Sequence, residues 1–191
     1  MPKIVDEWYR KGNDFAKVRM YKEAIESYDK ALEIDPKNAD IWRVKGNAHT
    51  ELWEFGKATE CYDEVIKIDP KNDEAWHKKG NALVGLSRYE EAVKCFDEAI
   101  KINPNASVWY DKGVAFGILS RYEDAVKCFN EVLTRDPDDV GAWHNKGVAL
   151  RALGRSEEAR RCFDEALKIN PKYELAIKDG KLAEKKHGIP L

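Results

Sequence analysis

The sequence has no long hydrophobic run. Nowhere do about 18 apolar residues follow one another, which is the minimum for a membrane-spanning helix. It also lacks the basic start and the apolar stretch of roughly 7 to 15 residues that mark a secretory signal. These absences predict a cytoplasmic protein that neither crosses nor binds a membrane.

Neither sign of charge is in excess. The chain has 33 lysines and arginines against 35 aspartates and glutamates, which gives a formal net charge of −2. Proteins that bind nucleic acid usually carry a surplus of positive charge that neutralises phosphates. The composition therefore disfavours nucleic acid as a partner.

Cysteine and histidine are scarce, with four of each in 191 residues. No Cys-x-x-Cys pair occurs, and the histidines are scattered, so we expect neither a metal site nor a nucleophile–base pair. We predict reduced structural thiols, a packed core histidine at His49, no cofactor and no enzymatic activity. The cysteines are Cys61, Cys95, Cys128 and Cys162.

What the sequence does have is a repeat of 34 residues, shortened to 33 once. Tryptophans mark it at Trp8, Trp42, Trp76, Trp109 and Trp143. A Lys-Gly pair follows each tryptophan, with glycines at Gly12, Gly46, Gly80, Gly113 and Gly147. An aromatic residue comes later in each copy, at Tyr28, Tyr62, Phe96, Phe129 and Phe163. Such self-similarity is the signature of a repeat architecture.

Each copy reads as two amphipathic helices. In the second copy Trp42 and Gly46 lie four residues apart on one face, and Ala58 and Tyr62 repeat this spacing after a predicted break at residues 54–56. A glycine inside a helix costs roughly 1 kcal/mol relative to alanine. We therefore expect the repeated glycine to allow close approach of the two helices.

The ends of the helices also have signals. A proline closes each copy, as in Ile34-Asp35-Pro36-Lys37-Asn38, and disfavours helix at the residue before it. Asn38, Asn72 and Asn105 are predicted N-caps of the helices that follow. The lysine before each glycine is expected to cover the seam with its alkyl stem while its ammonium reaches solvent.

This pattern resembles the tetratricopeptide repeat over residues 5 to 173. The resemblance implies an all-α fold, a right-handed superhelical solenoid of five helix–turn–helix units. The predicted units are residues 5–38, 39–72, 73–105, 106–139 and 140–173. Residues 174–187 are expected to form a C-terminal capping helix, which solenoids require. We predict that Leu175, Ile177 and Leu182 of this helix face the last repeat.

The resemblance further implies that the first helices line a concave groove and supply the binding residues. The residue after each tryptophan is Tyr9, Arg43, His77, Tyr110 or His144. Four positions further lie Asn13, Asn47, Asn81, Val114 and Val148, and Ile118 and Arg151 lie a further turn on. We expect the asparagines to bind the backbone of an extended peptide. The valines, with Tyr110 and Ile118, suit an apolar side chain, although both sets could instead serve packing or face solvent.

The predicted function is therefore a scaffold or adaptor that binds a peptide or a helix of a partner protein in the groove. The alternative is a structural, self-associating array that uses its convex face or terminal helix. A carboxylate clamp of the kind that grips chaperone tails is not expected, since no register supplies enough positive charge. RNA binding, known from a related helical repeat, is disfavoured by the tryptophan–glycine–proline pattern and the neutral charge.

Overall fold

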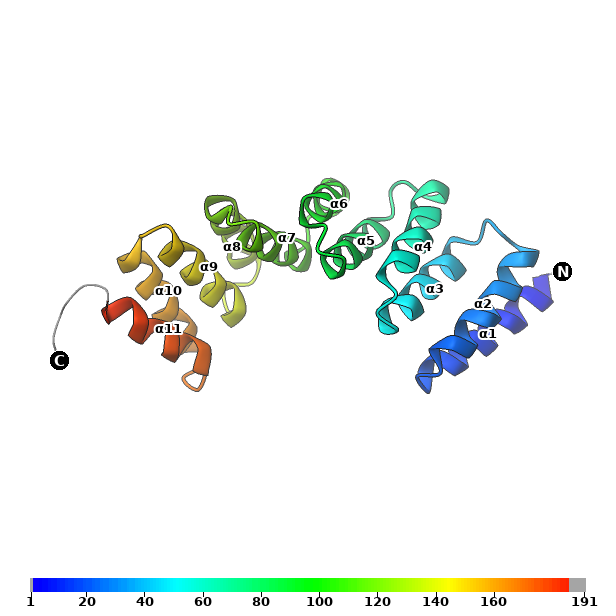
Figure 1. Ribbon diagram of the computed structural model, residues 1–191, viewed down its shortest axis with the longest axis horizontal. Coiled ribbons are helices and arrows are strands. Elements are labelled where there is room, and N and C mark those ends of the chain that lie inside the picture. The colour runs from blue at the N-terminus through cyan, green and yellow to red at the C-terminus, as the bar shows by residue number, and fades with distance from the viewer. Residues whose placement is uncertain (1, 186–191) are drawn as a thin grey trace. The chain divides into compact units, whose positions relative to one another are not determined.

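The computed structural model describes residues 2–185, with side chains from residue 3 to residue 180. This part of the chain consists of eleven helices and contains no strand (Figure 1). The helices are α1 (Pro2–Lys17), α2 (Tyr21–Ile34), α3 (Ala39–Glu51), α4 (Phe55–Ile68), α5 (Asp73–Gly85), α6 (Tyr89–Ile102), α7 (Ala106–Ile118), α8 (Tyr122–Arg135), α9 (Val140–Ala152), α10 (Ser156–Ile169) and α11 (Glu174–Lys185). The all-α fold of helix–turn–helix repeats is confirmed. Residues 186 and 187 of the predicted cap lie outside the described residues.

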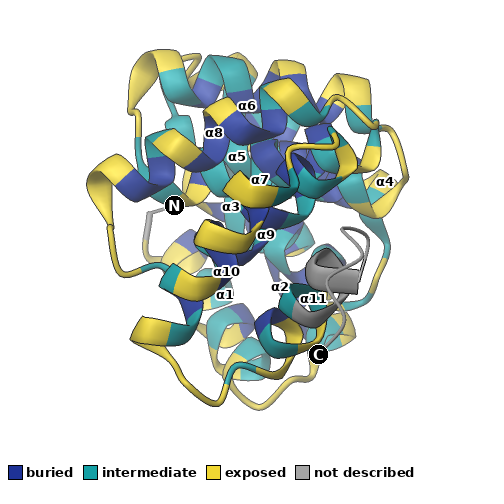
Figure 2. Ribbon diagram, turned by 90° about the vertical axis from the view of Figure 1, so that its left-hand side faces the viewer, coloured by how far each residue is buried: buried dark blue, intermediate teal, exposed yellow. Residues whose placement is uncertain are grey.

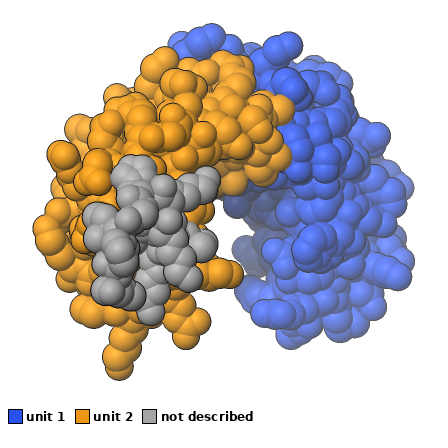
Figure 3. Space-filling model, turned by 60° about the vertical axis from the view of Figure 1, so that its left-hand side comes forward, with its two compact units in different colours: residues 1–103 blue, residues 104–191 orange. Residues whose placement is uncertain are grey.

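The chain divides into two compact units, residues 1–103 and residues 104–191 (Figure 3). Within each unit, consecutive helices pack against one another, so that α1 to α6 form unit 1 and α7 to α11 form unit 2. We call the odd-numbered helices α1 to α9 first helices and the even-numbered helices second helices. The division falls at Pro104, where the sequence is one residue short of the 34-residue repeat.

The repeated glycine lets the two helices of each hairpin approach closely. A Cβ atom on Gly80 would lie 2.4 Å from Cε1 of Phe96, and one on Gly147 would lie 2.6 Å from Cε1 of Phe163. Both rings are fully buried. Figure 2 shows the buried residues along the faces where helices meet, with exposed residues on the outer turns. The predicted role of this glycine is confirmed.

The turn within each hairpin lies earlier than predicted. In the second repeat α3 ends at Glu51 and α4 begins at Phe55, so Gly56 is inside a helix and the predicted break at residues 54–56 was wrong. The turn depends on one residue with positive φ, which is the same repeat position each time: Arg19, Trp53, Ser87, Ser120 and Gly154. Only the last is glycine, the residue that normally marks this conformation. The sequence therefore gave little sign of the turn.

The predicted N-caps are confirmed. The side-chain oxygens of Asn38, Asn72 and Asn105 accept hydrogen bonds from the backbone N–H three residues further on. Asp139 caps α9 in the same way and was not predicted. Each cap satisfies one of the backbone donors that a helix start leaves without a partner.

The link between the third and fourth repeats is one residue shorter than the other links, and this changes the environment of Trp109. The indole N–H of Trp42 donates to the carbonyl oxygen of Pro36, six residues earlier, at 2.9 Å, and Trp76 and Trp143 repeat this bond. Trp109 lies only five residues after Pro104, and its buried indole N–H has no hydrogen-bond partner among the described residues. One missing residue thus removes the acceptor.

The lysine before each glycine lies over the tryptophan ring of its own repeat. In the second repeat the ammonium of Lys45 is 4.9 Å from the centre of the Trp42 ring, a distance at which a cation–π interaction is favourable. The ammonium groups of Lys45 and Lys79 also bind Asp29 and Asp63 of the preceding repeat, at 2.5 and 2.6 Å. Both carboxylates are themselves 43–48% exposed, so these ion pairs lie at the surface, and the prediction that the ammonium groups reach solvent stays a prediction.

The C-terminal helix α11 packs against α10 and α9. Ala176 is fully buried there, whereas Leu175 is 52% exposed, so the prediction that Leu175 faces the last repeat was wrong. The side chain of Leu182 lies outside the described residues. Asp179 of α11 binds His144 and Arg151 of α9, at 2.9 and 2.8 Å. Since Asp179 is itself a polar side chain, this anchor was not visible in the hydrophobic pattern.

Candidate functional site

Three of the five residues that follow the tryptophans reach toward the next first helix or α11, and the other two pack within their own hairpins. Arg43 lies 3.7 Å from Glu74, the hydroxyl of Tyr110 accepts a hydrogen bond from Nδ2 of Asn145 at 2.8 Å, and the His144 ring binds Asp179. His144 is buried, and its ring packs edge-on against Tyr173. Tyr9 and His77 are half-buried, with their rings near Tyr28 and Phe96. This set of predicted site residues therefore also links neighbouring helices, and its role in binding stays a prediction.

The asparagines of unit 1 are used within their own repeats. The Tyr28 hydroxyl donates to Oδ1 of Asn13, and the Tyr62 hydroxyl donates to Oδ1 of Asn47, both at 2.8 Å. Asn81 cannot do the same because Phe96 has no hydroxyl, and its Nδ2 lies 3.3 Å from the His77 ring. The oxygens that we expected to offer to a peptide are thus already accepting hydrogen bonds in two of three repeats.

Burial strengthens the hold of these tyrosines on their protons. Desolvation raises the pKa of Tyr28 and of Tyr62 to about 12. Burial also raises the pKa of Tyr110, chiefly through desolvation. The phenols therefore act as hydrogen-bond donors or acceptors throughout the ordinary pH range, and none is prepared for proton transfer.

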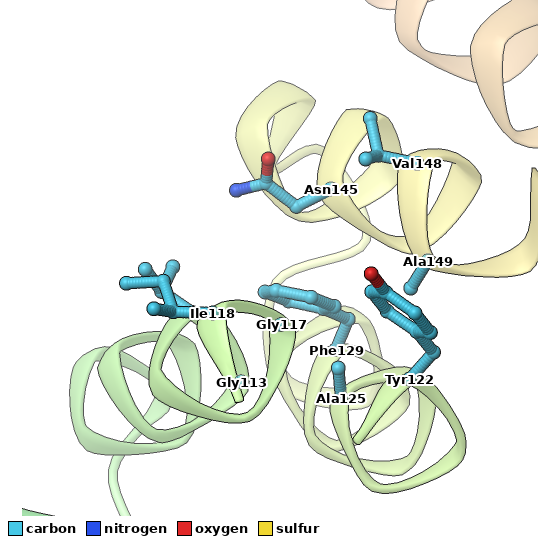
Figure 4. A pocket seen from close by; sticks show the side chains of 10 residues that line it. Gly113, Gly117, Ile118, Tyr122, Ala125, Phe129, Asn145, Val148 and Ala149 are labelled. Atoms are coloured by element: carbon cyan, nitrogen blue, oxygen red, sulfur yellow. The ribbon is translucent and has the colours of Figure 1, made fainter. Parts of the chain in front are cut away.

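The predicted apolar residues of unit 2 lie together. Val114 and Ile118 on α7 and Val148 on α9 line one open cavity of about 200 Å³ between these helices and α8 (Figure 4). We call it the unit 2 cavity. Its full lining is Gly113, Val114, Gly117, Ile118, Tyr122, Ala125, Phe129, Asn145, Val148 and Ala149. None of these side chains carries a charge, and Ile118 is 50% exposed. The cavity is therefore accessible and almost entirely apolar.

The equivalent positions of the first two repeats are polar. Where unit 2 has Val114, Ile118 and Val148, the first two repeats have Asn13, Lys17 and Asn47, which occupy the same places in the 34-residue pattern. The aromatic residue of the hairpin is a hydrogen-bonded tyrosine in these two repeats and Phe129 in the fourth, while the third repeat combines Phe96 with Asn81. Since these positions vary while the tryptophans and glycines do not, the scaffold leaves them free to differ.

A catalytic or metal centre is not evident in the part of the chain that the structure describes. No group of three His, Cys, Asp or Glu residues is placed to hold a metal ion there. The four cysteines are free and buried, and burial raises the pKa of Cys61 and Cys95 to about 11, which makes both thiols poor nucleophiles. His49 is a buried core residue, as predicted, and binds Glu54 at 2.7 Å. No described helix is long and apolar enough to cross a bilayer.

The hairpins and their glycine contacts agree with the family comparison. The profile described as tetratricopeptide repeat matches residues 5–38, 73–105, 106–139 and 140–179, and a second profile described as TPR repeat matches residues 46–87. The chain belongs to the tetratricopeptide repeat family. A comparison with curated proteins found no significant match to this sequence.

Solved tetratricopeptide repeat structures share the fold. A crystal structure of MamA superposes with a TM-score of 0.86 at 20% identity, covering 100% of this chain and 99% of that one. MamA from Desulfovibrio magneticus RS-1 gives a TM-score of 0.83 at 16% identity, covering 88% and 96%. YrrB, described as a TPR protein with an unusual peptide-binding site, gives 0.81 at 23% identity, covering 91% and 90%. At these identities the likeness shows the fold alone.

Seven of the ten residues that line the unit 2 cavity were not among the predicted site residues, namely Gly113, Gly117, Tyr122, Ala125, Phe129, Asn145 and Ala149. Gly117 belongs to the position that Ala16, Thr50, Val84 and Arg151 occupy in the other repeats, and its missing side chain was the available signal. Tyr122 and Asn145 had no such signal in the sequence. A tyrosine at the start of a second helix and an asparagine near a tryptophan are both typical of surface positions. Within a tetratricopeptide repeat, such residues reach a common cavity only through the packing of two successive first helices.

Proposed function

We propose that this protein is a non-catalytic scaffold that binds a segment of another protein on its first helices, with the unit 2 cavity as the principal contact. The observation that carries the proposal is the cavity itself, an accessible and almost entirely apolar hollow where the first two repeats have Asn13, Lys17 and Asn47. Accessible apolar hollows with a few polar groups are the usual form of a binding site. The peptide-binding site named for YrrB supports a peptide as the class of ligand.

The lack of charged side chains in the cavity lining favours an apolar contact. Burying a charged group without a partner is strongly unfavourable, and no lining side chain could pair with one. Covering Ile118 and the two valines, in contrast, removes apolar surface from water, which contributes about 25 cal/mol per Å². The partner segment therefore binds chiefly through apolar side chains.

The other predicted site residues extend the surface on either side of this contact. In unit 1, Tyr9, Arg43 and His77 accompany the asparagines Asn13, Asn47 and Asn81. Because Asn13 and Asn47 already accept a hydrogen bond from tyrosine, they would contact a peptide through the amide nitrogen. These contacts add to binding and are secondary to the cavity.

A random peptide library displayed on phage tests the proposal. The selection uses the wild-type protein and a Val114→Asn, Val148→Asn double variant, with Val84→Asn as the matched control, because Val84 is a half-buried valine of a first helix in unit 1. We expect peptides that bind the wild type and the control variant and lose at least about tenfold in affinity for the double variant. Equal affinity for all three proteins would place binding elsewhere.

The self-associating array is the competing function. Sedimentation velocity at increasing protein concentration distinguishes it. A size that rises with concentration, together with no selected peptide, would contradict the scaffold proposal and support self-association. A constant monomer that binds the selected peptides is the expected result.

A further inference from the structure

Gly117 has no packing reason to be glycine. It lies in the last turn of α7, and a Cβ atom built there would meet nothing within 4 Å. Gly113, one turn earlier, differs, because its Cβ would lie 2.9 Å from Cε1 of Phe129. A glycine within a helix costs roughly 0.5–1 kcal/mol relative to alanine. The fold explains Gly113 and leaves Gly117 without an explanation.

The other repeats fill this position with a side chain. It is Ala16, Thr50, Val84 or Arg151. The hydroxyl of Thr50 donates to the carbonyl oxygen of Gly46 and lies 3.3 Å from the hydroxyl of Tyr62, so it occupies the corresponding space in unit 1. Arg151 extends over the Phe163 ring to Asp179. Only the fourth repeat leaves the position empty.

The space that results has the size of a side chain. At about 200 Å³ the unit 2 cavity is smaller than the roughly 300–1,000 Å³ of pockets that hold free small molecules. Its lining includes Phe129 and Ala125 of α8, Val114 and Ile118 of α7 and Val148 of α9. Such a lining fits an apolar group and offers no partner to a charged one.

One polar group stands in this lining with capacity to spare. Asn145 uses its Nδ2 to donate to Tyr110, and its Oδ1 is the acceptor end of the same amide. An extended peptide has a backbone N–H close to each side chain that it inserts. The amide oxygen can accept that N–H while the side chain enters the cavity.

We propose that the absence of a side chain at Gly117 makes the unit 2 cavity a receptor for one bulky apolar side chain, such as leucine or methionine, of an extended partner segment, with Asn145 accepting a backbone N–H of that segment. This inference rests on the proposed function and names the chemistry that the site selects. Gly117 is then the specificity-determining position of the groove.

Nuclear magnetic resonance with methyl labels tests the receptor without any known partner. The probe is N-acetyl-leucine N-methylamide, with N-acetyl-aspartate N-methylamide as the charged comparison, titrated into protein labelled at valine and isoleucine methyls. The leucine probe is expected to shift the methyl signals of Val114, Ile118 and Val148 in the wild type, and the aspartate probe is not. Gly117→Leu should abolish the shifts. Equal shifts with both probes, or no shifts with either, would overturn the inference.

Stability provides the control, because filling the cavity should not harm the fold. Gly117→Ala and Gly117→Leu are expected to keep or raise the melting temperature while binding falls. Gly56→Ala is the matched control, since Gly56 also lies inside a helix with nothing within 4 Å of its Cβ, and it is remote in sequence from the cavity. It should keep full binding of the leucine probe.

Peptides selected by the wild-type protein separate this inference from the proposed function. Each apolar residue of a peptide is replaced by alanine, and affinity is measured for the wild type and for Gly117→Leu. One replacement should reduce affinity roughly tenfold or more for the wild type and have little effect for the variant. Peptides that bind both proteins alike would overturn the inference and leave the scaffold function intact. Failure to select any peptide would count against the scaffold function, while the leucine probe still decides the receptor.

Discussion

Unit 1 and unit 2 use the same helical hairpin for two different surfaces. In unit 1 a buried tyrosine donates to an asparagine on the first helix, as Tyr62 does to Asn47. In unit 2 phenylalanine replaces the tyrosine and valine replaces the asparagine, as in Phe129 and Val114, and a cavity is present beside them. The third repeat combines Phe96 with Asn81, whereas both repeats that have a tyrosine here also have an asparagine that accepts from its hydroxyl. The buried hydroxyl therefore requires a partner at the groove position, while the asparagine does not require a tyrosine.

Substituting the repeated glycine of the hairpin should destabilise both units to a similar extent. Gly80→Ala in unit 1 and Gly147→Ala in unit 2 each place a Cβ less than 3 Å from a buried phenylalanine ring. We expect each to reduce the free energy of unfolding by about 1–3 kcal/mol through overpacking. Urea denaturation followed by circular dichroism measures the loss. If one unit tolerated the change freely, the hairpins of the two units would not be equivalent.

Exchanging tyrosine and phenylalanine beneath the groove should have different effects on stability in the two units. Phe129→Tyr adds a hydroxyl facing Val114 and is expected to reduce the free energy of unfolding by about 1–3 kcal/mol, because the new polar group has no partner. Adding Val114→Asn should restore most of this loss by recreating the bond that Tyr62 makes with Asn47.

The reverse change in unit 1 completes the comparison. Tyr62→Phe should reduce the free energy of unfolding by about 1–3 kcal/mol, since it removes the hydrogen bonds of the Tyr62 hydroxyl with Asn47 and Thr50. The interaction energy of the double variant in unit 2 is obtained from the four denaturation curves. Additive effects would show that the aromatic and groove residues do not form a pair.

The anchor of α11 depends on pH. Although partial burial favours the neutral form of Asp179, hydrogen bonds from Arg151 and His144 hold its pKa below the ordinary value. The stabilisation of about 1 kcal/mol is therefore present above the unfolded pKa of about 3.9 and lost as the pH falls through the lowered folded pKa.

Hydrogen exchange of the Ile177 amide, which donates to the carbonyl oxygen of Tyr173 at the start of α11, measures this effect. Protection should be full near neutral pH, fall in acid, and be lower in Asp179→Asn at neutral pH. The variant should also have a weaker dependence on pH in the acid range, because the titrating group is gone. Identical protection in variant and wild type at every pH would show that apolar packing alone holds α11.

The shortened link gives the smallest effect. Inserting a lysine between Pro104 and Asn105 restores the six-residue spacing at which the other tryptophans bind a proline carbonyl. We expect the free energy of unfolding to rise by about 1 kcal/mol, as the Trp109 indole N–H gains an acceptor. Denaturant titration followed by tryptophan fluorescence measures the gain. A loss of stability would mean that the short link is required where the two units join in sequence.

The sequence predicted the helices well because their signals are local. Tryptophan, glycine and the capping asparagines recur in every copy or nearly every copy, and each acts within its own hairpin or at its own helix end. The turn was placed late because Trp53 adopts positive φ without being glycine. Leu175 was misplaced because α11 turns Ala176 inward and uses Asp179 as a polar anchor.

The candidate site was harder to predict because it depends on pairs of residues far apart in sequence. The apolar character of Val114, Ile118 and Val148 was visible, whereas the hydrogen bond between Tyr28 and Asn13 was not. The available signal was that the two repeats with a tyrosine, Tyr28 and Tyr62, both have an asparagine at the groove position. Asn145 and Tyr110 are 35 residues apart, so their bond required knowledge of how two successive hairpins stack.

The most direct test of the account is the nuclear Overhauser effect between a selected, bound peptide and the labelled methyls of the protein. If the partner binds at the unit 2 cavity, one apolar side chain of the peptide contacts Val114, Ile118 and Val148, and these contacts vanish in Gly117→Leu. Contacts only to methyl groups of unit 1, or contacts unchanged in the variant, would contradict the claim that the unit 2 cavity is where the partner binds.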